Sequence, residues 1–386
     1  MRFFTIIMAC NAGTSALPTL SPAPPHYDRR MIRPDLHHLP AYTPGDKVDG
    51  ALVLASNETS EPPLPAAIEA IEAAAPRMNR YPYMATSPLH HAIARLHGVT
   101  VDEVAIGCGS SALLQQLILA TCKDGQSTLF AWRSFEAYPI LSRIAGANPI
   151  QVPLDTHHRH DLEAMLEAIT ESTSLIILCN PNNPTGTIVR HDELDSFLTR
   201  VPGHVTVCID EAYLDYTDDD LTPDSIGLVQ RHPNACVART FSKCYGLAGA
   251  RVGYLVGSSD IISAVNRTQV PFSVSTLAHD AAIACLNDPE SLTARVSRTA
   301  SQRRRLRDFL LTEFIPSSRW ALRSDDIPES HANFQWLALG EKSDDFTEAL
   351  AKEHILVRCF SGDGVRITVT TAEETDQLID ALRTIA

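Results

Sequence analysis

The stretch Cys236-Val-Ala-Arg-Thr240-Phe-Ser242-Lys243-Cys-Tyr-Gly-Leu-Ala-Gly-Ala-Arg251 joins a short apolar run to a lysine. We predict a buried strand over Cys236–Thr240, which places Ser242 and Lys243 at its carboxyl end. A lysine there is a candidate nucleophile, provided that burial or a nearby cation lowers the pKa of its amine. Arg251 is a candidate for that cation, or for a phosphate ligand.

Upstream of this stretch, short apolar runs alternate with segments of helical periodicity. The predicted strands are Glu103–Ile106, Ser127–Ala131, Ile150–Leu154, Leu175–Cys179 and Val205–Ile209. The predicted helices are Pro65–Ala75, Ser87–His97, Ala112–Cys122, Phe135–Ala145, Asp161–Ile169 and Asp192–Arg200. Apolar strands that alternate with helices are typical of a parallel sheet covered on both faces. The sequence therefore predicts an α/β fold, with a mostly parallel sheet sandwiched by helices.

Polar residues gather where three successive predicted strands end. Asn180-Pro-Asn-Asn183-Pro-Thr-Gly186 follows one strand, Asp210-Glu-Ala-Tyr213 the next, and Ser242-Lys243 the third. Ligands of such sheets bind at the carboxyl ends of the strands. We therefore expect these side chains to converge on one ligand.

A pyridine ring would satisfy several of these side chains. The carboxylate of Asp210, at the end of a buried strand, needs a partner, and a pyridinium N–H is a fitting one. Asn183 and Tyr213 can hydrogen-bond a phenolate oxygen on the same ring. Phe135 could stack on its face.

The turn Gly107-Cys-Gly109-Ser110-Ser111-Ala112 allows two interpretations. A helix that begins after Gly109 offers backbone N–H groups, with Ser110 and Ser111, to a phosphate. Alternatively, G-x-G-x-x-A between a strand and a helix is a dinucleotide fingerprint. Arg133 lies near the position about twenty residues later where an acidic residue is expected, so only an NADP site could be argued.

Charge and hydropathy disfavour two classes of partner. The 386 residues include 46 acidic and 32 basic ones, for a formal charge of −14, and they contain no dense Lys/Arg run, so nucleic acid is not an expected partner. No apolar run approaches the ~20 residues of a membrane span. The nine cysteines are scattered without a CxxC pair, which indicates reduced thiols and a cytoplasmic location.

No metal site is predicted. The cluster His157-His158-Arg159-His160 lacks the spaced partners of a zinc set, and we interpret it as a solvated loop.

The chain divides into four predicted parts. Residues 1–30 form a disordered tail or a mis-called extension, since most of them are rich in Ala, Pro, Ser and Thr, and residues 31–60 form an N-terminal arm. Residues 61–275 form the large domain that carries the motifs above. Residues 276–386 form a smaller α+β domain. Its predicted elements are a helical stretch over Ser291–Phe314, strands over Asn333–Leu337, Leu356–Arg358 and Gly364–Thr370, and a helix over Ala372–Thr384.

The motifs together resemble a known family. The ordered set of the Asn180–Gly186, Asp210–Tyr213 and Ser242–Arg251 segments resembles the fold type I pyridoxal-phosphate aminotransferases, in the histidinol-phosphate aminotransferase branch. The similarity spans roughly residues 33 to 386. Within the branch, the segments over residues 129–140 and 357–368 are most similar to the actinobacterial aromatic (phenylalanine) aminotransferases.

The resemblance implies pyridoxal 5'-phosphate as the cofactor and a role for each motif residue. Lys243 would form a Schiff base with the cofactor and then carry a proton, so Lys243, Asp210 and Tyr213 are the implied catalytic residues. The residues implied to contact the cofactor are Tyr81, Ser110, Ser111, Phe135, Asn183, Asp210, Tyr213, Ser242, Lys243 and Arg251.

The resemblance also implies a homodimer, because Tyr81 matches a tyrosine that reaches the phosphate of the partner subunit. Arg366 matches the arginine that binds the anionic group of the substrate, and Arg358 is a second basic candidate. The expected reaction moves an amino group between a phenylalanine-like amino acid and 2-oxoglutarate. Histidinol phosphate is the alternative substrate. An NADP oxidoreductase and a catalytically silent cofactor-binding regulator are more distant alternatives.

Overall fold

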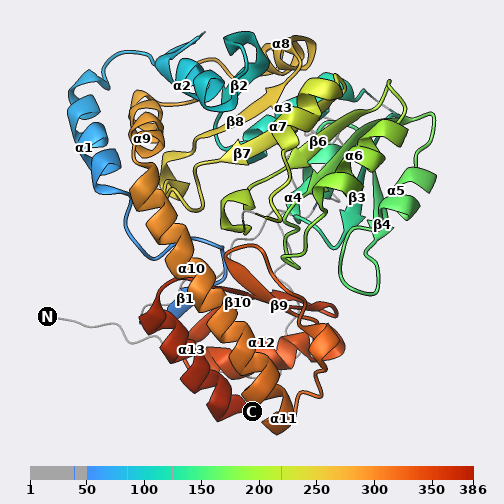
Figure 1. Cartoon of the computed structure of the whole chain (residues 1–386), viewed down its shortest axis with the longest axis vertical. Helices are drawn as coiled ribbons and strands as arrows, with labels where there is room; N and C mark the ends of the chain where they lie inside the picture. The colour runs from blue at the N-terminus through green and yellow to red at the C-terminus, as the bar shows by residue number, and fades with distance from the viewer. Residues whose placement is uncertain (1–38, 40–49, 85, 124, 219) are drawn as a thin grey trace, which may run out of the picture. The chain divides into compact units, whose positions relative to one another are not determined.

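A seven-stranded sheet contains every strand predicted between residues 100 and 240 (Figure 1). The computed structural model describes residues 39, 50–84, 86–123, 125–218 and 220–386. In spatial order the strands are β2 (Val104–Gly107), β8 (Gly253–Gly257), β7 (Ala235–Thr240), β6 (Thr206–Asp210), β5 (Thr173–Cys179), β3 (Ser127–Trp132) and β4 (Asn148–Pro153). Strand β8, which was not predicted, runs antiparallel to its neighbours β2 and β7, and the other neighbouring strands pair in parallel. The prediction of a mostly parallel sheet is confirmed.

Helices cover both faces of this sheet because both sets of alternating side chains are apolar. Ile176 and Leu178 of β5 pack on one face with α5, α6 and α7. Leu175 and Ile177 point to the other face, where they pack with α3, α4 and α8. These helices are α3 (Ser110–Thr121), α4 (Ala137–Ile144), α5 (Leu162–Glu167), α6 (His191–Arg200), α7 (Ser225–Arg231) and α8 (Ser259–Arg267).

A third apolar cluster holds the elements before and after the large sheet. It joins α1 (Pro65–Ala74), α2 (Pro88–His97) and α9 (Thr276–Leu286) with the segment that follows β7. Ser87 caps α2 by accepting a hydrogen bond from the His90 backbone, as the Ser-Pro start predicts. The turn that carries Lys243 is therefore packed in one cluster with helices that precede and follow the large sheet in the sequence.

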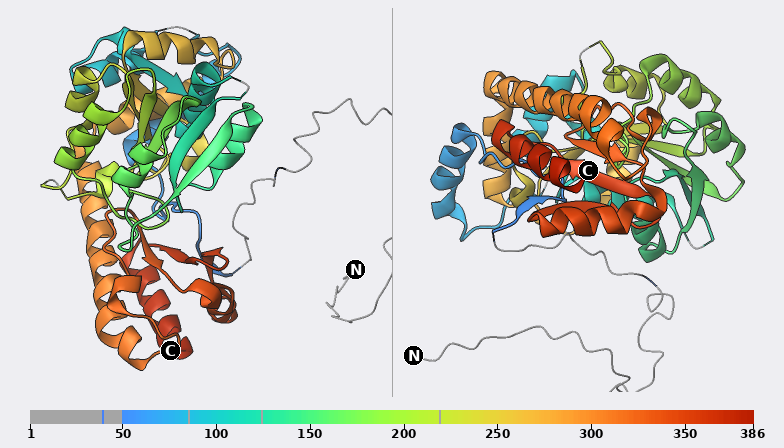
Figure 2. Two further views of the ribbon diagram at one scale, coloured as in Figure 1. Left: turned by 90° about the vertical axis from the view of Figure 1, so that its right-hand side faces the viewer. Right: turned by 90° about the horizontal axis from the view of Figure 1, so that it is seen from below.

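A second sheet joins three strands from the C-terminal part of the chain with one strand from the predicted arm. Its order is β1 (Leu52–Leu54), β10 (Ile355–Phe360), β11 (Gly364–Thr368) and β9 (Phe334–Leu337). One face packs on α10 (Pro289–Phe309), α12 (Ser343–Lys352) and α13 (Ala372–Ile385), which lie together in Figure 2, and α10 continues through a π-helical turn into α11 (Ile315–Ser317). Side chains alternate along the strands, so the opposite face carries Trp336, Arg358, Phe360 and Arg366.

Some predictions lie outside the described residues or need correction. The tail over residues 1–30 and the arm up to residue 49, apart from Leu39, lie outside the described residues, whereas β1 of the predicted arm pairs with β10. The prediction of a solvated histidine loop is wrong for His160, which is 7% exposed because its segment bridges back to Leu154. The division into large and small domains stays a prediction. In the described part of the chain, no helix is long and apolar enough to cross a membrane.

Candidate active site

Lys243 lies three residues after the last residue of β7. Its Nζ donates to the carbonyl oxygen of Ser56 at 3.2 Å and lies 5.5 Å from the centre of the Tyr213 ring. Burial lowers the pKa of Lys243 to about 7, and the nearby Arg366 guanidinium acts in the same direction. Arg251, the cation suggested by the sequence, has a smaller effect on this pKa. A large fraction of the lysine is therefore a free amine at neutral pH, as a nucleophile or proton acceptor requires.

Asp210 ends β6 and is 3% exposed. The hydroxyl of Tyr138, on α4, donates to its Oδ2 at 2.7 Å. Oδ1 is buried and has no hydrogen-bond partner among the described residues. Burial raises the pKa of Asp210 to about 6, although the Tyr138 hydrogen bond opposes this shift. Because an unpaired buried carboxylate oxygen is costly, Oδ1 is suited to accept a hydrogen bond from a ligand N–H.

Asn183 and Tyr213 follow β5 and β6, and β6 lies between β5 and β7 in the sheet. The Tyr213 hydroxyl accepts a hydrogen bond from Asn57 Nδ2 at 3.0 Å. Burial raises the pKa of Tyr213, so its hydroxyl stays protonated at neutral pH. Asn183 Oδ1 accepts a hydrogen bond from Arg366 Nη1. These contacts gather side chains from three adjacent strand ends, as the sequence predicted.

Ser242 and Arg251 lie together near the N-terminus of α3. Ser110 and Ser111 are the first two residues of α3, and Gly109 before them has a φ of 79°. A Cβ atom on Gly109 would lie 2.6 Å from Arg251 Nη2, so the guanidinium lies against this turn. Arg251 Nη1 donates to Ser242 Oγ at 3.4 Å. Backbone N–H groups and a guanidinium that lie close together are suited to bind a phosphate.

Arg358 and Arg366 are opposite each other across the β10–β11 pair. Arg366 is 6% exposed, and its Cζ lies 5.8 Å from the centre of the Phe360 ring. Arg358 lies against the same ring at 5.9 Å. Its Nε and Nη2 donate to Oε2 of Glu136 at 3.1 and 2.8 Å. The two predicted substrate ligands therefore lie together, but Arg358 is paired with a carboxylate of the chain.

The family model named Aminotransferase class I and II matches residues 49–382. The chain belongs to this aminotransferase family. It is 52% identical to the aromatic amino acid aminotransferase of Corynebacterium jeikeium, over 91% of this chain and 93% of that protein. It is 47% identical to the protein of the same name from Mycobacteroides abscessus, over 90% and 97% of the two chains. The crystal structure of histidinol-phosphate aminotransferase from Sinorhizobium meliloti, in complex with pyridoxal-5'-phosphate, superimposes with a TM-score of 0.81 at 27% identity, over 92% and 98% of the chains.

Family membership makes the chain a transaminase. The sheet topology also argues against a dinucleotide-binding site at the Gly107 turn. A dinucleotide fingerprint requires its first strand to be part of a parallel βαβ unit. In this aminotransferase the strand before the Gly107 turn, β2, is at the edge of the sheet and pairs antiparallel with β8. The NADP oxidoreductase and regulator hypotheses are therefore not retained.

Three residues of the site were not predicted from the sequence. Tyr138 and Glu136 flank Ala137 next to Phe135, and Asn57 lies in the predicted arm. Phe135 itself packs edge-on against Tyr138, with ring centres 5.4 Å apart. Tyr138 contacts Asp210, Glu136 contacts Arg358, and Asn57 contacts Tyr213. These contacts depend on how distant segments pack, which the local sequence pattern does not reveal. The roles of the predicted residues stay predictions.

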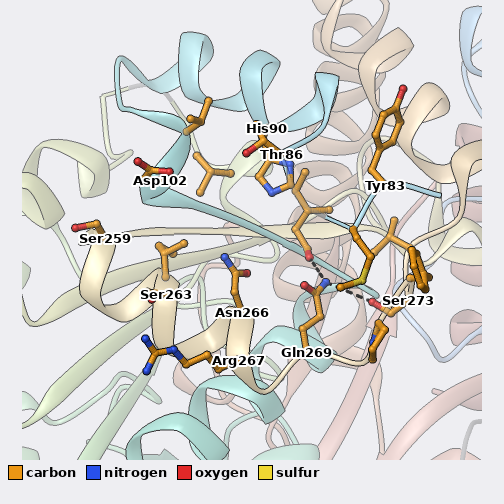
Figure 3. Close-up of a pocket in the computed structure, with 18 of the residues that line it drawn as sticks. Tyr83, Thr86, His90, Asp102, Ser259, Ser263, Asn266, Arg267, Gln269 and Ser273 are labelled. Carbon is orange, nitrogen blue, oxygen red and sulfur yellow. Dashed lines mark hydrogen bonds between the residues drawn. The ribbon is translucent and has the colours of Figure 1, made fainter. Parts of the chain in front are cut away.

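A separate cavity of about 700 Å³ is lined by none of the predicted cofactor or substrate residues (Figure 3). Figure 3 shows Tyr83 and His90 on one side of it, with Gln269 and Ser273 on the other, and Gln269 Nε2 donates to Ile106 O at 2.8 Å. Phe272 also lines it and stacks on Tyr81, with ring centres 4.6 Å apart. Tyr81 is 83% exposed, so this aminotransferase presents aromatic side chains on its surface here.

Proposed function

We propose that this aminotransferase moves the amino group between an aromatic amino acid and 2-oxoglutarate, with pyridoxal 5'-phosphate as its cofactor. The identity of 52% over nearly the whole chain to an aromatic amino acid aminotransferase carries the substrate class. The S. meliloti structure, which contains pyridoxal-5'-phosphate, supports the cofactor.

The residues present fit this cofactor. Oδ1 of Asp210, buried without a partner among the described residues, would accept the pyridinium N–H. Gly109, Ser242 and Arg251 would hold the phosphate. Glycine is needed at position 109 because a side chain there would occupy the space of the Arg251 guanidinium. Phe135 would stack on the ring. When bound, the cofactor supplies an electron sink for the electrons released at the substrate Cα.

Lys243 would accept the proton from the substrate Cα and donate it to the C4′ carbon of the cofactor. With a pKa of about 7, its amine is available as a base at neutral pH and its ammonium as an acid. Asp210 would keep its partner N–H protonated, and the hydrogen bond from Tyr138 would hold the carboxylate in place. Tyr213 would donate its hydroxyl proton to the ring oxygen.

Arg366 would bind the substrate α-carboxylate. Its guanidinium lies on the Phe334 and Phe360 rings, at 5.5 and 5.8 Å. A guanidinium that is held by aromatic faces and hydrogen-bonded to Asn183 is well oriented for a bidentate carboxylate. The aromatic side chains beside it offer an apolar surface to a substrate ring.

Half-reactions followed through the visible absorbance of the bound cofactor test this proposal. We expect phenylalanine to convert the spectrum of the wild-type protein and 2-oxoglutarate to restore it. A Lys352→Ala protein, changed at an exposed lysine that pairs with Glu348, is the control and should behave as wild type. A protein whose spectrum no amino acid changes would contradict the proposal.

Histidinol phosphate is the second candidate, favoured by the structural similarity to histidinol-phosphate aminotransferases. That substrate has no α-carboxylate, so Arg366 and Arg358 would bind its phosphate. The identity of 52% to an aromatic amino acid aminotransferase, against 27% to the histidinol-phosphate aminotransferase, favours the aromatic substrate. Competition of the two donors for one site decides, and a kcat/KM for histidinol phosphate far above that for phenylalanine would reverse our choice.

We also propose that the enzyme is a homodimer that acts in the cytoplasm. Exposed apolar side chains gather near Tyr81: Tyr83 (45%), Met84 (56%), Val270 (68%) and Phe272 (40%). An exposed apolar patch of this kind is typical of a protein interface. Phe272→Asp should therefore shift sedimentation toward the monomer, whereas the control Leu119→Asp, at another exposed apolar residue on α3, should not. A wild-type protein that sediments as a monomer at micromolar concentration would contradict the dimer.

A further inference from the structure

The side chain of Asn57 joins the Tyr213 hydroxyl to the end of strand β11. Asn57 lies three residues after β1 and is 1% exposed, and its φ of 54° is in the left-handed region that asparagine tolerates. Its Nδ2 donates to Tyr213 Oη at 3.0 Å, across 156 residues of sequence. Its backbone N–H donates to Thr368 Oγ1 at 3.0 Å, and its carbonyl oxygen accepts from Asn333 Nδ2 at 3.1 Å. The backbone of Asn57 is therefore held on both sides of its side chain.

The hydroxyl of Thr368 determines which way the Asn57 amide is turned. Thr368 is 2% exposed, and its Oγ1 accepts the backbone N–H of Asn57. The same hydroxyl donates to Asn57 Oδ1 at 3.2 Å, its one acceptor among the residues that the structure describes. Turning the amide over would place its NH2 group at Thr368 and leave a buried hydroxyl proton without an acceptor, which is costly. The amide therefore presents its N–H groups, and not its oxygen, to Tyr213.

A hydrogen bond from Asn57 determines how the Tyr213 hydroxyl can use its own proton. A phenol hydroxyl has one proton to donate and accepts through its oxygen. The oxygen is occupied by the Asn57 N–H, and in the described part of the chain no group accepts the Tyr213 proton. Burial raises the pKa of Tyr213, and the hydrogen bond from Asn57 acts against this rise. Consecutive hydrogen bonds strengthen one another, so Asn57 makes the hydroxyl a stronger donor to a ligand.

We infer that Asn57 is a positioning residue, whose amide turns the Tyr213 hydroxyl proton toward the ring oxygen of the cofactor. The inference rests on the proposed function, in which Tyr213 donates to that oxygen. A ring oxygen without this hydrogen bond carries more negative charge, so a proton on the neighbouring cofactor atoms is held more tightly. Asn57 therefore sets, through Tyr213, the pH at which the bound cofactor changes its protonation state.

A pH titration of the visible absorbance of the cofactor-loaded protein tests this role. Asn57→Gly keeps the left-handed backbone and removes the donor, so the midpoint of the titration should rise by about half a unit. Asn57→Asp keeps the shape of the side chain, but its carboxylate only accepts and draws the Tyr213 proton to itself. The midpoint should then rise by about one unit.

The same two substitutions in a Tyr213→Phe protein separate this role from a structural one. Without the Tyr213 hydroxyl, each substitution of Asn57 should move the midpoint by less than about half of its shift in the wild-type background, because coupled residues are not additive. Asn234→Asp is the matched control, since this amide donates to the Val205 carbonyl at 2.8 Å, ahead of β6 and β7. It should leave the midpoint unchanged.

Two results would overturn the inference and leave the proposed function intact. One is an equal shift of the midpoint in the two backgrounds, which a purely structural role produces. The other is a midpoint that neither substitution of Asn57 moves. A wild-type protein that gains no visible absorbance with pyridoxal 5'-phosphate would contradict the proposed function itself, and the inference would fail with it.

Discussion

The residues around Lys243 and the two ion pairs at the β10–β11 hairpin, Arg358–Glu136 and Arg133–Asp363, stabilise their charges in opposite ways. Asp210 is buried and its hydrogen-bond partner is a neutral hydroxyl, while Lys243 donates to a neutral carbonyl. Their pKa values are accordingly shifted toward neutrality, to about 6 and about 7. On the hairpin side, Arg358 and Arg133 are partly exposed and paired with Glu136 and Asp363.

The difference lies in how far each charge is already compensated. Charges held by neutral groups in a buried site are incompletely compensated, so a ligand that supplies the missing charge or N–H binds strongly and its position is fixed. Exposed ion pairs are already compensated and contribute little to stability. Substitutions should therefore have large effects at the first group and small effects at the second.

Lys243→Ala should give the largest effect. It removes the amine that would attach the cofactor and carry the proton, so turnover should fall by about 10⁴-fold. The visible absorbance of the covalently attached cofactor should disappear in the same sample. Lys352→Ala is the control for the loss of a lysine. Retention of both turnover and the wild-type spectrum in Lys243→Ala would place the chemistry elsewhere.

Asp210→Asn should act in opposite directions on activity and on stability. Turnover should fall by about 10²–10³-fold, because a neutral amide cannot stabilise the positive ring nitrogen. The buried carboxylate destabilises the folded wild-type protein, because folding raises the pKa of Asp210 from 3.8 to about 6. This destabilisation is absent below about pH 4, grows between about pH 4 and 6, and stays constant at higher pH. The Asn side chain does not ionise, so the variant lacks it.

Urea unfolding of the cofactor-free protein measures the second part of this prediction. Asp210→Asn should exceed the wild type in free energy of unfolding by up to about 3 kcal/mol at pH 8. The two proteins should differ little at pH 4. A variant less stable than the wild type at pH 8 would show that the carboxylate is well compensated without a ligand, and the contrast with the hairpin would then be lost.

Tyr138→Phe should have a moderate effect, visible mainly in the pH profile. The Tyr138 hydroxyl stabilises the charged form of Asp210, so its removal should raise the pKa of Asp210 further. The acid limb of kcat/KM should move to higher pH by up to about one unit. Tyr254→Phe is the matched control, because this buried tyrosine loses a bond to His97 instead. Equal displacement of the acid limb in both variants would contradict the assignment.

The sequence predicts the first group of residues far better than the second. Asn183, Asp210 and Lys243 each follow an apolar strand, and parallel strands bring their carboxyl ends to one edge, so local pattern alone predicts their convergence. Glu136 and Asn57 reach the site only because β10 packs near α4 and β1 joins the small sheet. Strand β8 was missed because Gly253-Tyr-Leu-Val-Gly257 offers only three apolar residues between glycines.

Asp363→Asn should produce the smallest effect. The Arg133–Asp363 pair has side chains that are 28% and 41% exposed, and Arg133 also lies on the Trp132 ring at 4.7 Å. Water and the ring both remain available to the guanidinium, so the loss in free energy of unfolding should be below about 1 kcal/mol. The loss should shrink further at 1 M salt, where exposed charges are screened within about 3 Å. Urea unfolding at low and high salt measures it. A loss that is large and independent of salt would mean that the hairpin charges are held as firmly as Asp210.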